Sequence, residues 1–183
     1  VFKVQNGIIR VSGQDWGYLI TKKEYENYRL VVEWKWGKET WIPRKENARD
    51  SGILIHCIGP DKVWKKSIEY QIIEGGTGDF ILVDNTTLTV KGETKTGGRF
   101  NRYNKGNWKD VKGFRNKENE VEKFYGEWNI SEIICEGDKI TNIINGVIVN
   151  EGYNANPCKG QILFQSEGAE IYFRKVDLYP LNK

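Results

Sequence analysis

The 183-residue chain contains no methionine, one histidine and three cysteines, and it has no run of about 18 apolar residues that could cross a bilayer. A single imidazole, His56, excludes sites that need two or more histidines, including the common catalytic zinc triads. Cys57, Cys135 and Cys158 are odd in number and widely spaced, which fits neither a disulfide framework nor a CxxC metal knuckle. Free, buried thiols are the simplest interpretation. One bridge with one thiol left over is the alternative.

A strong charge of either sign is also missing. The chain has 28 Lys and Arg against 25 Asp and Glu, a formal charge of +3, whereas nucleic-acid binding needs a concentrated basic surface. No nucleic-acid partner is therefore expected. What the chain does have is 20 Gly, 7 Trp, 9 Tyr and 7 Phe, a composition that favours aromatic strands joined by turns. The length fits one domain, residues 1–183. We therefore expect a single all-β domain.

Two neighbouring strands are predicted over residues 51–58 and 69–73. The first is apolar on both faces, which is typical of a central strand in a packed sandwich. Because successive side chains of a strand point to opposite faces, His56 is expected to share a face with Leu54. The second strand follows after a short Gly-Pro turn, so the two are predicted to pair.

The stretch Ser67–Asp79 contains the most suggestive polar pattern. Alternation places Glu69 and Gln71 on one face, and Glu74 follows where a glycine-rich turn begins. A strand that serves only as sheet more often carries Thr, Lys or Ser on its wet face. This stretch is therefore interpreted as the floor of a carbohydrate site.

Elsewhere the pattern predicts strands and turns, with one exception. Residues 28–36 alternate as a half-buried strand with an aromatic face. Asn145-Gly146 predicts a type I′ hairpin, and a second hairpin is expected around Gly168. A short helical turn is expected over residues 22–27. Between about residues 85 and 126 the alternation stops, and a long basic loop is predicted.

Six segments, in order along the chain, carry a combined motif: residues 28–36 (YRLVVEWKW), 50–53 (DSGI), 68–72 (IEYQI), 126–129 (GEWN), 144–146 (ING) and 160–174 (GQILFQSEGAEIYFR). Together they resemble the 3-keto-disaccharide hydrolase domain family. The resemblance implies a concanavalin A-like jelly-roll β-sandwich of two antiparallel sheets, with a carbohydrate bound on the concave side. It also implies a periplasmic, cell-surface or secreted location.

The resemblance assigns site roles to individual residues. The catalytic residues would be Glu69, His56 and Gln71. The substrate-binding residues would be Ser51 and Gln165, with Trp64 and Asp79 nearby. Arg49 and Glu74 are further candidates for substrate binding, which the resemblance does not itself assign. The sequence departs from the family pattern at three positions: Asp50, His56 and Glu167 stand where Asn, Arg and His are usual.

The family's substrate explains why such residues are needed. A ketone at C3 of a sugar acidifies the hydrogen at C2, so a base can remove it and the group at C1 can leave; water may then add back. This reaction needs a base, a donor or metal for the enolate oxygen, and an acid for the leaving oxygen. Glu69 or His56 could be the base, and Gln71 and Ser51 could orient ring hydroxyls. No cofactor follows with certainty, and a divalent metal ion held by His56 and Glu69 is a hypothesis.

Two other functions are compatible with the sequence. Glu69-x-Gln71-x-x-Glu74 resembles the catalytic strand of laminarinase-type retaining glucanases, in which a bulge brings both glutamates to one face. A non-catalytic carbohydrate-binding module is the third candidate; its stacking platforms would be Trp36, Trp41, Trp64 and Trp108.

Structural roles are the alternatives for single residues. His56 could be a satisfied, half-buried histidine, and Glu69 could be the ion-pair partner of Arg49 or Arg174. Asp79, which follows Thr-Gly, could be a turn residue.

Overall fold

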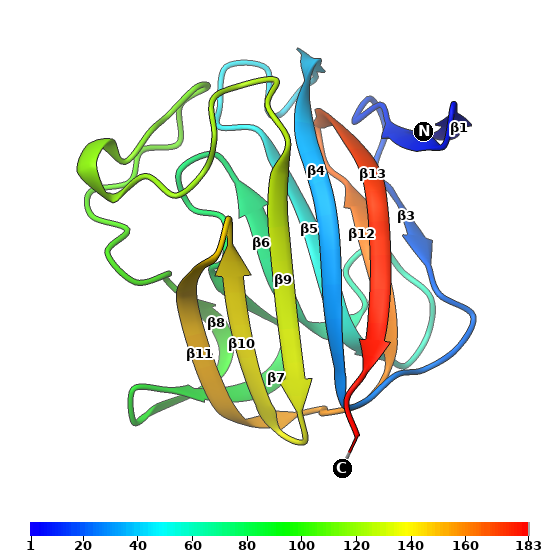
Figure 1. Cartoon of the computed structure of the whole chain (residues 1–183), viewed down its shortest axis with the longest axis vertical. Helices are drawn as coiled ribbons and strands as arrows, with labels where there is room; N and C mark the ends of the chain where they lie inside the picture. Colours follow the sequence, from blue (N-terminus) through cyan, green and yellow to red (C-terminus); the bar gives the residue numbers. More distant parts are fainter. Residues whose placement is uncertain (183) are drawn as a thin grey trace.

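The computed structural model describes residues 1–182 and consists of antiparallel strands joined by turns (Figure 1). The strands are β1 (Phe2–Gln5), β2 (Ile8–Val11), β3 (Gly17–Ile20), β4 (Tyr28–Thr40), β5 (Asp50–Ile58), β6 (Lys66–Ile73), β7 (Phe80–Val90), β8 (Glu93–Phe100), β9 (Asn129–Glu136), β10 (Lys139–Ile144), β11 (Val147–Asn156), β12 (Gln161–Ser166) and β13 (Ala169–Pro180). Within the described residues, helical structure is limited to one 3-10 turn, Lys117–Asn119. The all-β prediction is confirmed.

The strands form two layers that face each other (Figure 1). One layer has the order β1-β2-β13-β4-β9-β10-β11, and the other has the order β3-β12-β5-β6-β7 with β8 paired to β7. The two layers are continuous where β11 pairs with β7. This architecture is the predicted jelly-roll sandwich. In residues 1–182, no helix is long and apolar enough to span a bilayer.

The hydrophobic core lies between the two layers and follows the alternation of the strands. In β4, Tyr28, Leu30, Val32 and Trp34 are almost completely buried, whereas Arg29 between them is exposed. Strand β5 is buried along eight of its nine residues because it lies between β6 and β12. The predicted half-buried strand, the predicted central strand and the pairing of β5 with β6 are all confirmed.

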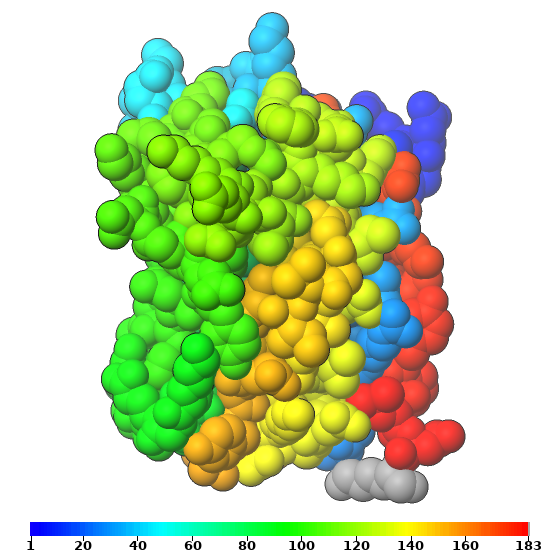
Figure 2. All heavy atoms as spheres, turned by 60° about the vertical axis from the view of Figure 1, so that its left-hand side comes forward, coloured from blue at the N-terminus to red at the C-terminus, as the bar shows by residue number. Residues whose placement is uncertain are grey.

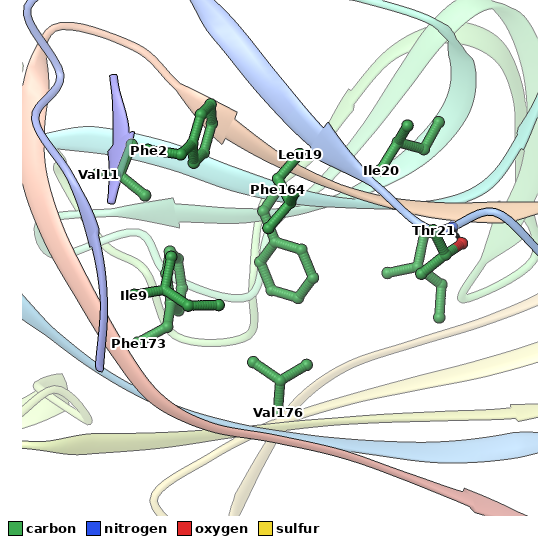
Figure 3. Close-up of a pocket in the computed structure, with 10 residues that line it drawn as sticks. Phe2, Ile9, Val11, Leu19, Ile20, Thr21, Phe164, Phe173 and Val176 are labelled. Atoms are coloured by element: carbon green, nitrogen blue, oxygen red, sulfur yellow. Dashed lines mark hydrogen bonds between the residues drawn. The ribbon is translucent and has the colours of Figure 1, made fainter. Parts of the chain in front are cut away.

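One end of the core contains an apolar cavity of about 280 Å³ (Figure 3). Figure 3 shows Ile9 of β2, Phe164 of β12 and Val176 of β13 around it. The hydroxyl of Thr21 is its polar group, and it donates to the Lys23 carbonyl (2.8 Å) and accepts from the Ile162 amide (3.0 Å). The cavity lies between the layers, and it shares no residue with the polar cavity described below.

Of three predicted turns, one is confirmed and two are wrong. The Asn145-Gly146 hairpin joins β10 to β11 with positive φ at both residues, as a type I′ turn requires. The predicted hairpin at Gly168 is wrong, because β12 and β13 pair within different layers and the turn carries the chain across the sandwich. The predicted helical turn at residues 22–27 is also wrong. Tyr25 forms a bridge with Gly160 instead.

The predicted loop over residues 85–126 is too long. Its first part belongs to the hairpin of β7 and β8, whose glycines at 97 and 98 both have positive φ and hide the alternation. The irregular segment is residues 101–128. Figure 2 shows this segment in green at the top of the molecule, beside the light-blue turn that follows β4. The Lys112 amide donates to the Glu46 carbonyl (3.0 Å), which joins the two.

Glu122 anchors this segment and gives a stability prediction. Its buried carboxyl group accepts from the Thr77 amide (3.3 Å), and burial raises its pKa to about 8 from an ordinary value of 4.5. Below pH 4.5 the group is protonated in both the folded and the unfolded protein. As the pH rises toward 8 only the unfolded state ionises, so folding loses stability. Glu122→Gln should remove this loss. The free energy of unfolding of the variant, compared with that of wild type, should therefore be higher at pH 8 than at pH 5 by up to about 4 kcal/mol.

The measurement is thermal and urea unfolding of the variant and the wild type at both pH values. The matched control is Glu118→Gln, which replaces an exposed carboxylate of the same segment and should follow the wild type. A stability difference between Glu122→Gln and wild type that stays constant from pH 5 to pH 8 would contradict the buried, protonated state of Glu122.

Candidate active site

A row of side chains crosses the layer that contains β5, β6, β7 and β8, because these strands pair in a fixed register. Glu69 of β6 lies opposite Leu54 of β5 on one side and Ile81 of β7 on the other. Ile81 in turn lies opposite Arg99 of β8. Paired residues of neighbouring strands point to the same face, so Glu69, Ile81 and Arg99 form one line.

Above this row lies a cavity of about 310 Å³. The lining comes from strands β5 to β8, the turn before β5, the connection between β5 and β6, the segment after β8 and the turn after β12. It consists of Arg44, Asp50, Trp64, Glu69, Gln71, Ile73, Ile81, Arg99, Trp108, Asp110 and Glu167. Two tryptophans and several charged groups therefore meet at one place.

Glu69 is the central acid of the cavity. Its side chain lies over Gly52, where any Cβ would overlap the carboxyl group, so glycine leaves the space that Glu69 occupies. The residue is 3% exposed. Burial raises the pKa of Glu69 well above its ordinary value, repulsion from Glu167 and Asp50 adds to this rise, and Arg99 opposes it. Glu69 therefore holds its proton more tightly than an ordinary glutamate.

Gln165 of β12 connects Glu69 to an aromatic wall. With its amide oriented so that both groups find partners, its nitrogen donates to Glu69 Oε1 (3.1 Å) and its oxygen accepts from Trp64 Nε1 (3.3 Å). Trp64 also packs edge-on against Trp16, with ring centroids 4.4 Å apart. The placement of Glu69, Gln165 and Trp64 agrees with the predicted site.

A second acid of the cavity is Asp50. The sequence did not predict it as a site residue, and Asp50 differs from the Asn that is usual at this position in the family. Its carboxylate accepts from Gln71 and from Arg44. Burial raises the pKa of Asp50, Glu167 raises it further, and Arg44 and Arg99 lower it. Among the three most buried acids of the cavity, Asp50 alone contacts a guanidinium directly. This contact opposes the rise in the pKa of Asp50.

Glu167, on the turn after β12, is a third acid of the cavity and is half-buried. Burial raises its pKa, and Arg44 opposes the rise. Three crowded carboxyl groups cannot all ionise without cost, so the cavity retains protons at pH values where exposed carboxyl groups have lost them. Carboxyl groups with raised pKa values are typical of sites that use acid and base catalysis.

The prediction that His56 faces the site is wrong. His56 has φ +53°, and the β5 register with β6 shifts between Ile55 and Ile58, so a bulge reverses the alternation there. The ring packs against Tyr28 of the core, with centroids 5.9 Å apart, and Cys57 takes the place beside Leu54. Burial lowers the pKa of His56 to about 4. His56 and Glu69 lie on opposite faces and cannot share a metal ion.

No other metal cluster replaces this predicted pair. Among residues 1–182, no three His, Cys, Asp or Glu side chains are arranged to hold a metal ion. Cys57 and Cys135 are buried free thiols as expected, whereas Cys158 is free but exposed.

Ser51 also faces away from the cavity. It precedes Gly52 in β5, so it points into the sandwich, where its hydroxyl donates to the Gln165 carbonyl (3.1 Å). Its predicted role in binding substrate is replaced by a structural one, the connection between β5 and β12.

Arg49 and Glu74 form their own buried ion pair on the other face. Arg49 Nη1 lies 2.6 Å from Glu74 Oε1, and the amides of Arg49 (2.9 Å) and Gly113 (2.8 Å) donate to Glu74 Oε2. Ile73 lines the cavity together with Glu69 and Gln71, so no bulge turns Glu74 inward. Neither Arg49 nor Glu74 reaches the cavity, which contradicts their predicted substrate contacts and the glucanase-like pairing of Glu69 with Glu74.

Asp79 is a buried residue that binds side chains next to the cavity. It is fully buried and binds Arg99 Nε (2.7 Å), Lys105 Nζ (2.5 Å) and the Arg102 amide (2.6 Å). These contacts use both carboxylate oxygens, so Asp79 positions Arg99 and does not itself line the cavity. The prediction of a substrate contact is wrong for this residue.

Of the four proposed tryptophan platforms, the structure brings two to the cavity. Trp64 and Trp108 line it, whereas Trp36 is buried in the core and Trp41 donates to the Ser12 carbonyl (3.1 Å). The lining residues that the sequence did not reveal as a site are Arg44, Asp50, Ile73, Ile81, Arg99, Asp110 and Glu167. A strand assignment for β8 would have suggested Arg99, but its two glycines obscured the alternation.

Two tryptophans, the Gln165 amide and buried carboxyl groups therefore offer stacking faces and polar groups of the kind that a sugar can use. The chain belongs to the 3-keto-alpha-glucoside-1,2-lyase-like domain family, whose profile matches residues 2–178. This match confirms the family that the six sequence segments resemble. Among curated proteins, none matches the sequence significantly.

Solved structures support the fold. A proposed glycosyl hydrolase of Parabacteroides distasonis is 21% identical with a TM-score of 0.64, and the alignment covers 99% of this chain and 90% of that one. The carbohydrate-binding module CBM66 of Bacillus subtilis is 9% identical with a TM-score of 0.66, covering 98% and 91%. The β-glucanase of Bacillus licheniformis is 11% identical with a TM-score of 0.52, covering 96% and 78%. Enzymes and a binding module thus share this architecture.

Proposed function

We propose that the protein cleaves the glycosidic bond of 3-keto glycosides by removing the C2 proton and eliminating the group at C1, after which water adds to the product. The observation that carries this proposal is Glu69, a buried carboxyl group with a raised pKa at the floor of a cavity flanked by Trp64 and Trp108. A base of raised pKa removes a carbon-bound proton more effectively than an ordinary carboxylate does.

The chemistry needs two further groups. As the Glu69 carboxylate takes the C2 proton, the C1–O bond breaks and the leaving oxygen requires a proton. Glu167 is the candidate donor, because it lines the same cavity and burial raises its pKa above the ordinary value of a glutamate. Asp50, held by Arg44 and Gln71, supplies a carboxylate to accept from ring hydroxyls. The tryptophans offer faces on which a sugar ring can stack.

The deciding experiment compares matched substrates. The protein is incubated with a 3-keto glucoside and with the corresponding ordinary glucoside, with and without a chelator, and released aglycone is measured. We expect release from the 3-keto compound alone. Cleavage of only the ordinary glucoside would overturn the proposal. Binding of plain oligosaccharides without turnover of either compound would favour a binding module.

A further inference from the structure

Arg99 stands at the far end of the row of side chains from Glu69. Three adjacent strands carry Glu69, Ile81 and Arg99 in register, and the strand spacing places the Cα atoms of the two charged residues about 10 Å apart. Ile81 between them is short and apolar. A sugar ring lying over Ile81 would therefore have the carboxyl group on one side and the guanidinium on the other.

The guanidinium of Arg99 is fixed in place on one edge. Its Nε (2.7 Å) and Nη2 both donate to Asp79 Oδ2. Arg99 also packs against Trp108, with its Cζ 5.6 Å from the ring centroid. Within the described residues, Nη1 has no hydrogen-bond partner, and the side chain remains 33% exposed at the cavity. One edge of the group is thus anchored and the other is available to a ligand.

The charge around Arg99 differs from that around the other cavity arginine. Asp79 carries one negative charge and binds two cations, Arg99 and Lys105, so a positive charge remains uncompensated at this end. Arg44, in contrast, contacts two carboxylates, Asp50 and Asp110. The available positive charge of the cavity is therefore at Arg99.

We infer that Arg99 is a catalytic residue that stabilises the negative charge formed on the C3 oxygen of the substrate; this inference rests on the proposed function. When the C2–H bond breaks, the proton moves to the Glu69 carboxylate. The electron pair forms a C2=C3 double bond, and the carbonyl π pair moves onto O3. Arg99 donates hydrogen bonds to that oxygen. The O3 pair then re-forms the C3=O3 bond, the C2=C3 pair becomes a C1=C2 bond as the C1–O bond breaks, and the leaving oxygen takes a proton from Glu167.

An anchored donor is effective in this role because it needs no reorganisation when the charge forms. Removing a single donor of this kind from an enzyme typically lowers kcat by about 100- to 1,000-fold. Arg99→Ala should therefore lower kcat on a 3-keto glucoside by about this factor, with a much smaller change in KM. Added guanidinium should restore part of the activity of Arg99→Ala.

The experiment uses a substrate analogue that can enolise but has no leaving group, 3-keto-1,5-anhydroglucitol. In D₂O, wild type should exchange the C2 hydrogen, and Arg99→Ala should lose this exchange while still binding the analogue, as measured by tryptophan fluorescence. Arg99→Lys keeps the charge and tests the donor geometry if the alanine variant unfolds. The control is Arg29→Ala, which removes an exposed guanidinium paired with Glu132 on the other layer and should behave as wild type.

The outcomes separate the inference from the proposed function. Wild-type exchange rates in Arg99→Ala, with cleavage intact, would overturn the role of Arg99 and leave the proposed function standing. A wild-type protein that neither exchanges the analogue nor cleaves 3-keto glucosides would overturn both. Loss of exchange in Arg99→Ala with a wild-type unfolding temperature, together with rescue by guanidinium, would support the inference.

Discussion

Replacement of Glu69 by glutamine is expected to lower cleavage of a 3-keto glucoside by about 100- to 10,000-fold, the range typical of a lost general base. The amide has the size of the carboxyl group but cannot accept the C2 proton. Stability should not fall, because Glu69 has no cation in direct contact and its burial disfavours the charged form. The expected result is an inactive protein with an unchanged or higher unfolding temperature.

The measurement is kcat and kcat/KM for Glu69→Gln beside Glu122→Gln, which also removes a buried carboxyl group but lies outside the cavity and should retain activity. For wild type, kcat/KM should rise with pH as Glu69 loses its proton. Because burial raises the pKa of Glu69, that rise should lie above pH 4.5, the ordinary value for glutamate. Full activity in Glu69→Gln would remove this residue from the chemistry.

Replacement of Asp79 by asparagine should cause the largest loss of stability, about 3–5 kcal/mol, the usual cost of removing one partner of a buried ion pair. Lys105 is only 6% exposed, and burial lowers its pKa while Asp79 raises it. Without the carboxylate, the ammonium group is buried with no counter-charge. The unfolding temperature should drop by about 10 °C, and activity should fall because Arg99 loses its anchor.

Asp84→Asn is the matched control, because Asp84 lies in β7, the strand that Asp79 precedes, but pairs with Lys62 at the surface. Thermal unfolding of both variants tests the difference. The unfolding temperature of Asp84→Asn should match that of wild type. If Asp79→Asn unfolds at the wild-type temperature, the carboxylate does not hold the segment after β8 as described.

The sequence predicted those parts of the structure that follow from alternation within one strand. Glu69 and Gln71 face the cavity because β6 is regular from Ser67 to Ile73. His56 was misplaced because a bulge reverses the face of β5, and no local residue pattern marks a bulge at a histidine. The predicted hairpin at Gly168 was wrong because a glycine turn does not show which layer the next strand joins.

The remaining errors concern long-range partners. Glu74 pairs with Arg49, which precedes β5, and Asp79 pairs with Arg99 of β8 and with Lys105 of the segment after β8. Neither suggested ion pair of Glu69 forms, since Arg49 binds Glu74 and Arg174 binds Glu33. Contacts between distant segments are fixed by the tertiary structure, and a single sequence does not contain their register.

Strand β13 has a consequence for how the domain folds. It is the last strand of the described chain, yet it lies between β2 and β4, which come from the first part of the sequence. During synthesis, the layer that contains β4 and β9 remains open at this position until β13 has left the ribosome. Pairing at such sequence separation is slow, because the loop entropy is lost before the contacts form. The domain is therefore expected to complete its fold only once β13 is available, on a timescale of about milliseconds to seconds.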